Sequence, residues 1–215
     1  MEMYEIQRKE LIEQLVRKGI KDKNVLDAML QIERHKFVSG STIMHAYEDV
    51  ALPLGYGQTI SQPYTVAFMT QELKVKKDMK ILEVGTGSGY QAAILEKMGA
   101  RVYSIERNFD IYAKTQKLFD ELGIRVYCKL GDGTIGWEEF APFNGIIVTA
   151  GSPSIPNALL KQLEIGGRLV IPVGDRETQS LKIVKRLNEK ECAQKNIPNF
   201  RFVPLIGREG WSKEL

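Results

Sequence analysis

A glycine-rich segment carries the strongest chemical signal in this sequence. It reads ILEVGTGSGYQAAIL over residues 81–95, where an apolar run typical of a strand leads directly into a helical pattern. Gly85, Gly87 and Gly89 permit a tight turn and a close approach of the backbone to a ligand. A loop of this kind, at the carboxyl end of the first parallel strand, is where a nucleotide-like cofactor is expected to bind.

Two acidic residues lie where they could hold the rest of such a cofactor. Glu106 ends the next apolar run, 21 residues after Gly85, and its carboxylate can accept hydrogen bonds from both hydroxyls of a ribose. The alternative is a surface glutamate paired with Arg107. Asp132 lies between two glycines after the third run and could hold an adenine amino group. The alternative for Asp132 is an ordinary Asp-Gly turn.

The residue after the third glycine distinguishes between cofactors. The dinucleotide fingerprint has a glycine there, for packing near a pyrophosphate. This chain has Tyr90 at that position, which suits a cofactor without a pyrophosphate, such as S-adenosylmethionine. The sequence therefore predicts S-adenosylmethionine as the cofactor, S-adenosylhomocysteine as its product, and no metal. An NAD-dependent oxidoreductase is the disfavoured alternative.

Alternating strands and helices are expected to position these residues. Apolar runs predict strands at 80–84, 101–105, 124–130, 145–150 and 168–172, and helical periodicity predicts helices at 88–98, 110–122 and 155–163. Two further strands at 181–187 and 199–203 are expected to form a hairpin. The predicted fold is therefore α/β, with a doubly wound, mostly parallel, Rossmann-like sheet.

The first 78 residues have a different pattern. Helices are expected at 4–18, with Leu11, Ile12, Leu15 and Val16 on one face, and around 25–30. Residues 41–63 predict a long loop or short strands, and 64–73 a third helix. We expect one domain over 1–215, with an N-terminal helical lobe and substrate loop at 1–78. The cofactor-binding core and the C-terminal strands occupy 79–215.

Composition restricts the classes of partner and compartment. Apolar residues make up 43% and charged residues 27% of the chain, and the net charge of +3 comes from interleaved charges. We expect no nucleic-acid partner and no membrane span. Cys128 and Cys192 are too few for a disulfide framework, and the N-terminus lacks the apolar core of a signal peptide. These features favour a cytoplasmic protein with reduced thiols, and we expect it to be a monomer.

Several segments together resemble one family, the protein-L-isoaspartate (D-aspartate) O-methyltransferases. The resemblance runs from about Leu11 to Trp211. It is carried by the segments MLQIERHKFV, AYEDVALPLGYGQTISQPYTVAFM, ILEVGTGSGYQAAIL, IER, GDG, GGRLVIPVG and RFVPLIGREGW. GQTISQP is specific to this family, whereas the glycine loop is shared by many methyltransferases.

The resemblance implies methyl transfer to the free α-carboxylate of L-isoaspartyl residues in damaged proteins and peptides. The methyl ester then collapses to a succinimide, part of which reopens as normal aspartate. The family's active-site serine falls on Ser61, within Thr59-Ile60-Ser61. We assign catalysis to Ser61 and Thr59, and substrate binding to Ile60, Val203, Pro204 and Leu205. The expected cofactor contacts are Gly85, Thr86, Gly87, Gly89, Glu106, Arg107, Asp132 and Gly133.

Two positions depart from the pattern of the family. Many members have aspartate where this chain has Asn144, which keeps the hydrogen-bonding capacity but not the charge. A second alanine is usual where this chain has Gly151. Neither position touches the segments that carry the resemblance.

The expected chemistry needs no general base. An α-carboxylate has a reference pKa of about 3.5 and is ionised near neutral pH. The two histidines, His35 and His45, are therefore interpreted as structural. Ser61 is expected to donate a hydrogen bond and not to act as a nucleophile, although both hydroxyls could instead cap the helix that begins near Pro63.

Three further positions have two interpretations each. Val203–Leu205 could pair with the substrate as an added strand or be a simple core strand. Tyr56 and Trp211 could line the cleft, or Trp211 could anchor the C-terminus. Rival functions are a methyltransferase acting on a small molecule and a non-catalytic protein that binds the adenosyl cofactor.

Overall fold

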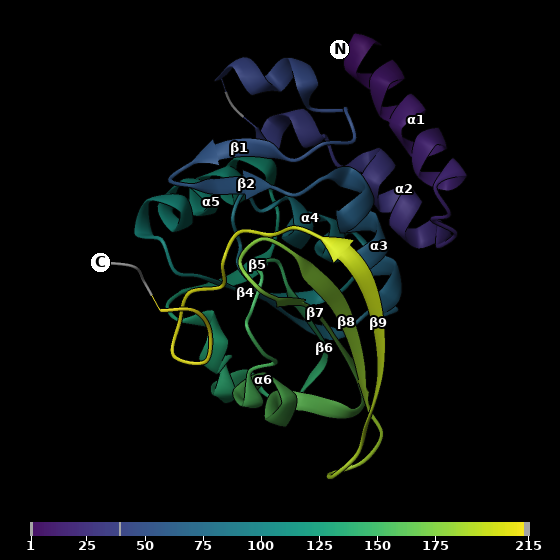
Figure 1. Cartoon of the computed structure of the whole chain (residues 1–215). Helices are drawn as coiled ribbons and strands as arrows, with labels where there is room; N and C mark the ends of the chain where they lie inside the picture. Colours follow the sequence, from purple (N-terminus) through teal and green to yellow (C-terminus); the bar gives the residue numbers. More distant parts are fainter. Residues whose placement is uncertain (1, 39, 213–215) are drawn as a thin grey trace.

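A central seven-stranded sheet organises the molecule, which we describe from a computed structural model of residues 2–38 and 40–212 (Figure 1). The strand order is β5-β4-β3-β6-β7-β8-β9. The first five strands of this order pair in parallel, and β8 and β9 add antiparallel pairs. This confirms the predicted doubly wound, mostly parallel sheet. The strands are β3 (Lys80–Val84), β4 (Arg101–Glu106), β5 (Val126–Leu130), β6 (Phe143–Val148), β7 (Leu163–Gly174), β8 (Gln179–Arg186) and β9 (Cys192–Phe200).

Helices cover both faces of the sheet. Ile81 packs on one face with Ile94 of α4, and its neighbour Leu82 packs on the other face with Leu159 of α6. Burial on both faces explains why the central strands are almost continuously apolar. The helices of this part are α3 (Pro63–Leu73), α4 (Tyr90–Lys97), α5 (Phe109–Leu122) and α6 (Asn157–Gln162), with short turns η3 (Gly133–Ile135) and η4 (Glu138–Phe140).

The N-terminal helices share a hydrophobic core with the sheet. Leu15, Val25 and Met29 are buried in the same cluster as Ile94. The expected inward position of Val16 is wrong, because this side chain is 51% exposed. Leu11 and Leu15, four residues apart, already form the buried stripe, and Val16 lies about 100° around the helix from Leu15. The elements here are α1 (Glu2–Arg17), α2 (Lys23–Gln31), η1 (Arg34–Phe37) and η2 (Gly40–His45).

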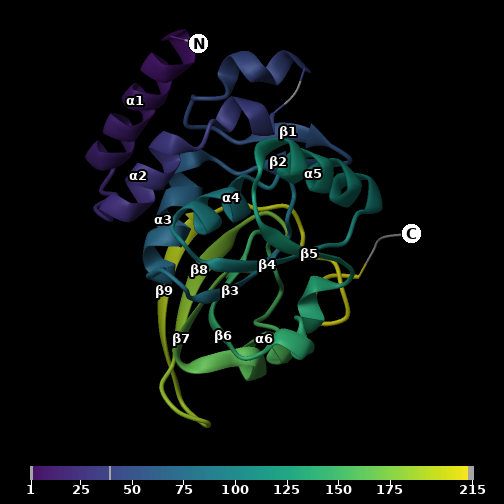
Figure 2. The same ribbon diagram turned by 180° about the vertical axis from the view of Figure 1, so that it is seen from behind.

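A small hairpin follows these helices, as the short-strand interpretation of residues 41–63 predicted. Strands β1 (Leu52–Gly55) and β2 (Gln58–Ile60) are antiparallel. Gly55, Tyr56 and Gly57 form the turn and have φ angles of 93°, 54° and 68°. In Figures 1 and 2 the hairpin lies beside α5, at the end of the molecule that also holds α1 and α2.

Two C-terminal boundaries differ from the predictions. The helix expected at 155–163 covers only Asn157–Gln162. It ends there because the next residue, Leu163, already belongs to β7 and pairs with Phe143 of β6, before an irregularity in the register. The last strand ends at Phe200 instead of covering 199–203. The ladder stops there because the Gln179 side chain accepts the hydrogen bond of the Phe202 N–H at 2.8 Å.

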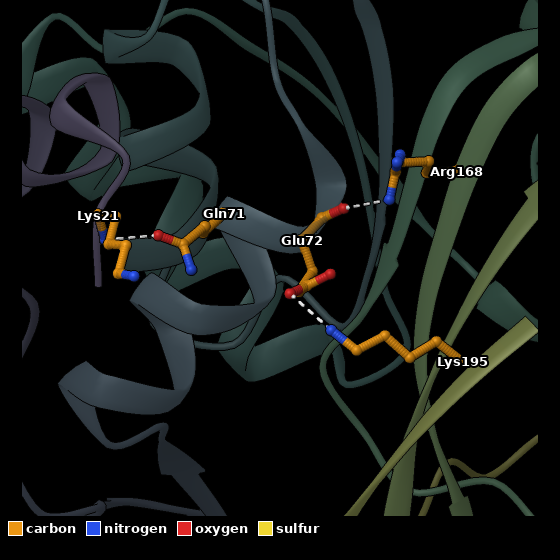
Figure 3. A network of polar contacts seen from close by, with 5 residues as sticks. All are labelled: Lys21, Gln71, Glu72, Arg168 and Lys195. Atoms are coloured by element: carbon orange, nitrogen blue, oxygen red, sulfur yellow. Dashed lines mark hydrogen bonds and ion pairs between the residues drawn. The ribbon is translucent and has the colours of Figure 1, made fainter. Parts of the chain in front are cut away.

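Helix α3 is tied to its neighbours on two sides (Figure 3). The Gln71 side chain accepts a hydrogen bond from the Lys21 N–H at 2.7 Å, in the connection between α1 and α2. On the other side, the Glu72 carbonyl accepts from Arg168 of β7 at 3.3 Å, and the Glu72 carboxylate pairs with Lys195 of β9 at 3.4 Å. These contacts fix the helix that begins two residues after Ser61.

Candidate active site

The strand order changes direction between the neighbouring strands β3 and β6, and a cavity opens at their carboxyl ends. Val84 and Val148 are register partners at the carboxyl ends of the two strands. Crossovers leave these strands toward opposite sides of the sheet, so the crevice beyond their ends is the expected ligand position. A cavity of about 310 Å³ occupies it.

The glycine loop forms one wall of this cavity. Gly85 and Gly87 line it, with φ angles of 97° and 51° that other residues adopt with strain. Gly89 does not line it. A Cβ atom at Gly89 would come within 2.5 Å of the Phe119 ring on α5. Gly89 therefore permits close packing of α4 against α5, which differs from the cofactor contact expected for it.

Thr149 is a wall residue that the sequence analysis did not find. Its N–H donates to the Val84 carbonyl at 3.0 Å, and its hydroxyl donates to the Gly85 carbonyl at 2.7 Å. A Cβ atom at Gly85 would collide with this hydroxyl. Thr149 directly follows an apolar strand at the switch point, and that position was the available signal for it.

Glu106 ends β4 with its carboxylate fixed by backbone donors. One oxygen accepts from the Gly87 N–H at 3.0 Å, and the other accepts from the N–H groups of Arg107 and Asn108, both at 2.8 Å. Glu106 and Arg107 both line the cavity. The alternative of an ion pair with the Arg107 side chain is wrong, because the contact is with the backbone. Carboxylate oxygens accept several hydrogen bonds each, so acceptor capacity remains for a ribose.

Asp132 lies directly before a residue of the cavity wall. It does not line the cavity, whereas its neighbour Gly133 does. One carboxylate oxygen accepts from the N–H and hydroxyl of Thr134 at 2.9 and 2.7 Å, and the other accepts from the Arg208 N–H at 2.8 Å. Asp132 therefore ties the C-terminal segment to the end of β5. A carboxylate accepts more hydrogen bonds than these, so the contact of Asp132 with an adenine amino group stays a prediction.

A buried polar chain lies beneath the glycine loop. The Thr86 and Ser104 hydroxyls are 2.6 Å apart, and Ser104 donates a short hydrogen bond to Glu83. Glu83 is fully buried, and burial raises the pKa of its carboxyl to about 8; the Ser104 hydrogen bond opposes the shift, and the charge of Glu106 adds to it. Thr86 also lines the cavity. The loop therefore rests on a carboxyl group that the fold keeps protonated at neutral pH.

This pKa predicts how stability depends on pH. The pKa of Glu83 is about 8 in the folded chain against an ordinary value of 4.5, so unfolding releases a proton between these values. This group's stabilising contribution is complete below pH 4.5 and falls by up to about 1.4 kcal/mol per pH unit toward pH 8. Glu83→Gln, which stays neutral, should therefore become more stable relative to the parent as pH rises. Urea unfolding of both proteins at pH 5, 6.5 and 8 measures this, and parallel stability curves would contradict it.

Ser61 and Thr59 lie where the first cavity meets a second one of about 810 Å³. Both residues line both cavities, and neither hydroxyl forms a hydrogen bond within residues 2–38 and 40–212. The alternative that they cap α3 is wrong. The residue preceding that helix is Gln62, which makes no side-chain cap, and the first-turn N–H of Tyr64 is bound by Asp49 at 2.7 Å.

The segment 203–205 forms the opposite side of the junction. Val203 and Pro204 line both cavities, and Leu205 and the buried Ile60 line the first. The Val203 carbonyl and the Leu205 N–H both bond to Gly151 at 2.8 Å. One edge of this segment is therefore already occupied, and the Pro204 carbonyl is the group on the other edge without a bond among the described residues.

The other candidate residues have structural positions. His35 bonds to the Tyr47 hydroxyl at 2.8 Å and His45 to Glu48 at 2.7 Å, and neither lines the cavity. The Trp211 indole donates to the Gly151 carbonyl at 3.1 Å, so it anchors the C-terminal segment. Tyr56 does line the cavity, from the tip of the hairpin.

The two departures from the family pattern have local explanations. The Asn144 amide accepts from the Lys80 N–H at 2.7 Å and donates to Glu164, which an aspartate could not do. It lies at the amino end of β6, opposite the cavity. A Cβ atom at Gly151 would come 3.0 Å from Gln179, the side chain that ends the β9 ladder.

The described residues form neither a metal site nor a membrane-spanning helix. Within 2–38 and 40–212, no group of three or more His, Cys, Asp or Glu side chains could hold a metal ion. No helix of these same residues is both long and apolar enough to cross a membrane.

The sheet, its switch-point cavity, the glycine loop and Glu106 define an S-adenosylmethionine-dependent methyltransferase of Rossmann-like fold. The chain belongs to the protein-L-isoaspartate(D-aspartate) O-methyltransferase family, whose family model matches residues 6–210. It is 51% identical over 209 residues to a protein-L-isoaspartate O-methyltransferase of Chlorobium limicola, with 96% of each chain covered. A Flavobacterium johnsoniae enzyme of the same name is 52% identical over 200 residues and covers 93% of each.

Solved structures agree with this family. A protein-L-isoaspartate O-methyltransferase superposes with a TM-score of 0.86 at 29% identity, covering 94% of this chain and 67% of the other. A Plasmodium falciparum protein assigned to the same activity, in complex with S-adenosyl-L-homocysteine, gives a TM-score of 0.82 at 26% identity, covering 93% and 98%. The predicted family, fold and cofactor class are confirmed.

Proposed function

We propose that this chain moves a methyl group from S-adenosylmethionine to the free α-carboxylate of L-isoaspartyl residues in damaged proteins, which starts their return to aspartate through a succinimide. The observation that carries the proposal is the position of Ser61 and Thr59. Their unbonded hydroxyls lie where the cavity beside the glycine loop meets a larger groove. A cofactor on one side and a peptide on the other would meet at these two residues.

The cavity fits the cofactor in three respects. Gly85 and Gly87 expose backbone that a side chain would cover, Glu106 presents a fixed carboxylate, and Gly133 leaves the wall beside Val84 open. We propose that Glu106 holds the ribose hydroxyls and that Gly85–Gly87 lie against the methionyl part. When bound, the cofactor supplies a methyl group on a positively charged sulfur.

The residues of the chain then act by positioning. The substrate carboxylate is ionised near neutral pH and needs no base. Ser61 and Thr59 donate hydrogen bonds to it and orient one oxygen toward the cofactor side of the junction. Tyr56, 61% exposed at the hairpin tip, lies at the rim and limits access of water.

The backbone of the substrate needs a partner as well. We propose that the Pro204 carbonyl accepts a hydrogen bond from a substrate N–H. This contact would use main-chain groups and so add affinity with little dependence on sequence. It replaces the broader expectation of a free edge at Val203–Leu205, because Gly151 already occupies the other edge.

We further propose a monomer that works in the cytoplasm and binds neither nucleic acid nor membranes. Acidic and basic residues are interleaved along the sequence, and the net charge is only +3. Cys128 and Cys192 are free thiols, one half-buried and one exposed, as a reducing compartment permits.

One assay tests the reaction and the role of Ser61 together. The parent enzyme should methylate an isoaspartyl peptide and leave its normal aspartyl twin unmodified, as measured by transfer of labelled methyl groups. Ser61→Ala removes one hydrogen bond to a charged group, and such bonds contribute about 1.5–3 kcal/mol. We therefore expect kcat/KM for the peptide to fall about 10- to 100-fold, with unchanged affinity for S-adenosylhomocysteine.

Ser61→Thr is the matched control, because it keeps a hydroxyl and should retain much more activity than Ser61→Ala. Full turnover and normal peptide KM in Ser61→Ala would exclude the positioning role. Equal methylation of the two peptides by the parent would exclude the proposed function itself.

A further inference from the structure

The junction between the two cavities has a third hydroxyl besides those of Ser61 and Thr59. Thr149, the residue directly after β6, lines the cavity beside the glycine loop and also the larger groove. Of the residues within 2–38 and 40–212 that line both, it alone hydrogen-bonds to the glycine loop. Thr149 therefore connects the proposed cofactor side of the junction to the substrate side.

Two hydrogen bonds fix Thr149 and the start of the loop. Its N–H donates to the Val84 carbonyl at 3.0 Å, which continues the pairing of β3 with β6 by one residue. Its hydroxyl is 2.7 Å from the carbonyl oxygen of Gly85 and 3.1 Å from that of Val84. A hydroxyl has one proton to donate, and the shorter distance assigns it to Gly85. The first glycine of the loop is thus tied to the end of the neighbouring strand.

Gly85 and Thr149 are also matched in shape. Gly85 has a φ angle of 97°, and a Cβ atom on it would collide with the Thr149 hydroxyl. The hydroxyl therefore occupies space that is open because residue 85 has no side chain. A methyl group in place of the hydroxyl needs a separation of about 3.5 Å, so Thr149→Val should push the Gly85 carbonyl away by up to about 1 Å.

The bond to Gly85 removes Thr149 as a donor to the substrate. An ionised carboxylate accepts hydrogen bonds and donates none. The single hydroxyl proton of Thr149 already points to Gly85, whereas the hydroxyls of Ser61 and Thr59 have no partner within residues 2–38 and 40–212. The three hydroxyls at the junction therefore divide into two that are free to bind a carboxylate and one that holds the loop.

We propose that Thr149 is a positioning residue for methyl transfer, because its hydroxyl sets where the first glycine of the loop lies relative to Ser61 and Thr59. In the proposed complex this loop lies against the methionyl part of the cofactor, which carries the methyl group. A displaced loop therefore misdirects the methyl group without removing a contact to the peptide. The inference rests on the proposed function and adds the residue that sets the geometry between the methyl donor and its acceptor.

The expected effect is larger on turnover than on binding. A misplacement of about 1 Å between reacting groups can lower a rate about 100-fold, whereas a neutral hydrogen bond changes an equilibrium constant about 2- to 10-fold. For Thr149→Val we expect kcat to fall about 10- to 100-fold and the dissociation constant of S-adenosylhomocysteine to rise about 2- to 10-fold. The peptide KM should change less than about 2-fold, because no group that binds the peptide is lost.

The test compares Thr149→Val with Thr149→Ser, which keeps the hydroxyl and should recover most of the turnover. Thr149→Ala removes the same bond without crowding the loop, and it takes the place of the valine variant if that protein does not fold. Steady-state kinetics with an isoaspartyl peptide and S-adenosylmethionine measure kcat and KM. Calorimetry with S-adenosylhomocysteine measures binding to each variant without requiring turnover.

Thr115→Val is the matched control. The Thr115 hydroxyl on α5 donates to the Gly87 carbonyl, also at 2.7 Å, but Thr115 lines neither the cofactor cavity nor the larger groove. The control therefore removes an equal bond to the same loop at a distance from the junction. Its loss of kcat should be at least about 5-fold smaller than that of Thr149→Val.

The outcomes separate this inference from the proposed function. Parental kcat in Thr149→Val, or an equal loss of kcat in Thr115→Val, overturns the positioning role and leaves the proposed function intact. A peptide KM raised about 10-fold with unchanged affinity for S-adenosylhomocysteine also overturns it, since Thr149 would then bind the substrate directly. No methylation of any isoaspartyl peptide by the parent overturns the proposed function, and parental affinity for S-adenosylhomocysteine in Thr149→Val separately contradicts the hold of Thr149 on the loop.

Discussion

Glu106→Ala should weaken the binding of S-adenosylmethionine and S-adenosylhomocysteine about 100-fold or more. The carboxylate fixes the Gly87 N–H and, in the proposed complex, holds two ribose hydroxyls. Each hydrogen bond to a charged acceptor contributes about 1.5–3 kcal/mol, and about 1.4 kcal/mol corresponds to a factor of 10. Titration calorimetry with S-adenosylhomocysteine measures the loss directly, without requiring turnover.

The substitution also affects the folded chain, so the design needs controls. Glu106→Ala leaves the N–H groups of Gly87, Arg107 and Asn108 without their acceptor. Unfolding by urea therefore has to be measured beside binding, at a temperature where the variant is folded. Glu106→Asp keeps the charge with a shorter reach and should lose less affinity. A folded Glu106→Ala protein with parental affinity would show that the ribose is held elsewhere.

Local patterns in the sequence predicted the glycine loop and Glu106 correctly as parts of one cavity. Both positions follow from a simple rule, since residues at the carboxyl ends of adjacent parallel strands meet at one edge. Gly85 directly follows β3, Glu106 ends the neighbouring β4, and both line the cavity. The contacts of these residues with the ligand are part of the proposal, whereas their proximity to one another could be predicted from their spacing in the sequence.

The position of Asp132 depended on a contact that no local pattern contains. Its partner, the Arg208 N–H, is 76 residues further along the chain. The acidic turn could be located from the sequence, but the return of the C-terminal segment across it could not. The same holds for Gly89, whose environment is set by the Phe119 ring on another helix.

The hydroxyl pair at Ser61 and Thr59 shows another limit of prediction from sequence. From the sequence alone, a serine and a threonine before a proline fit a helix cap as well as they fit a substrate site. Only the packing of Asp49 against the first turn of α3 removes that alternative. Family resemblance pointed to this region, and within residues 2–38 and 40–212 neither hydroxyl forms a hydrogen bond, so the catalytic role stays a proposal.

Arg34→Ala should lower the free energy of unfolding by about 3–5 kcal/mol, the largest stability effect that we expect from a single substitution. Arg34 is fully buried between the N-terminal lobe and α4. It donates to the Ala46 carbonyl at 2.8 Å, and its guanidinium carbon is 4.9 Å from the centre of the Tyr90 ring. Truncation removes that bond and leaves a cavity, and such losses in a core reach this magnitude.

The consequence should extend to the cofactor, because Tyr90 lines the cavity and begins the helix that follows the glycine loop. Arg34→Met refills most of the volume but has no hydrogen-bond donors. Its free energy of unfolding should therefore lie between those of Arg34→Ala and the parent. Arg17→Ala, at a side chain 69% exposed, should change stability by no more than about 0.5 kcal/mol. Urea unfolding with and without S-adenosylhomocysteine measures all three. A loss below about 1 kcal/mol in Arg34→Ala would mean that the N-terminal lobe is held to α4 by its apolar contacts alone.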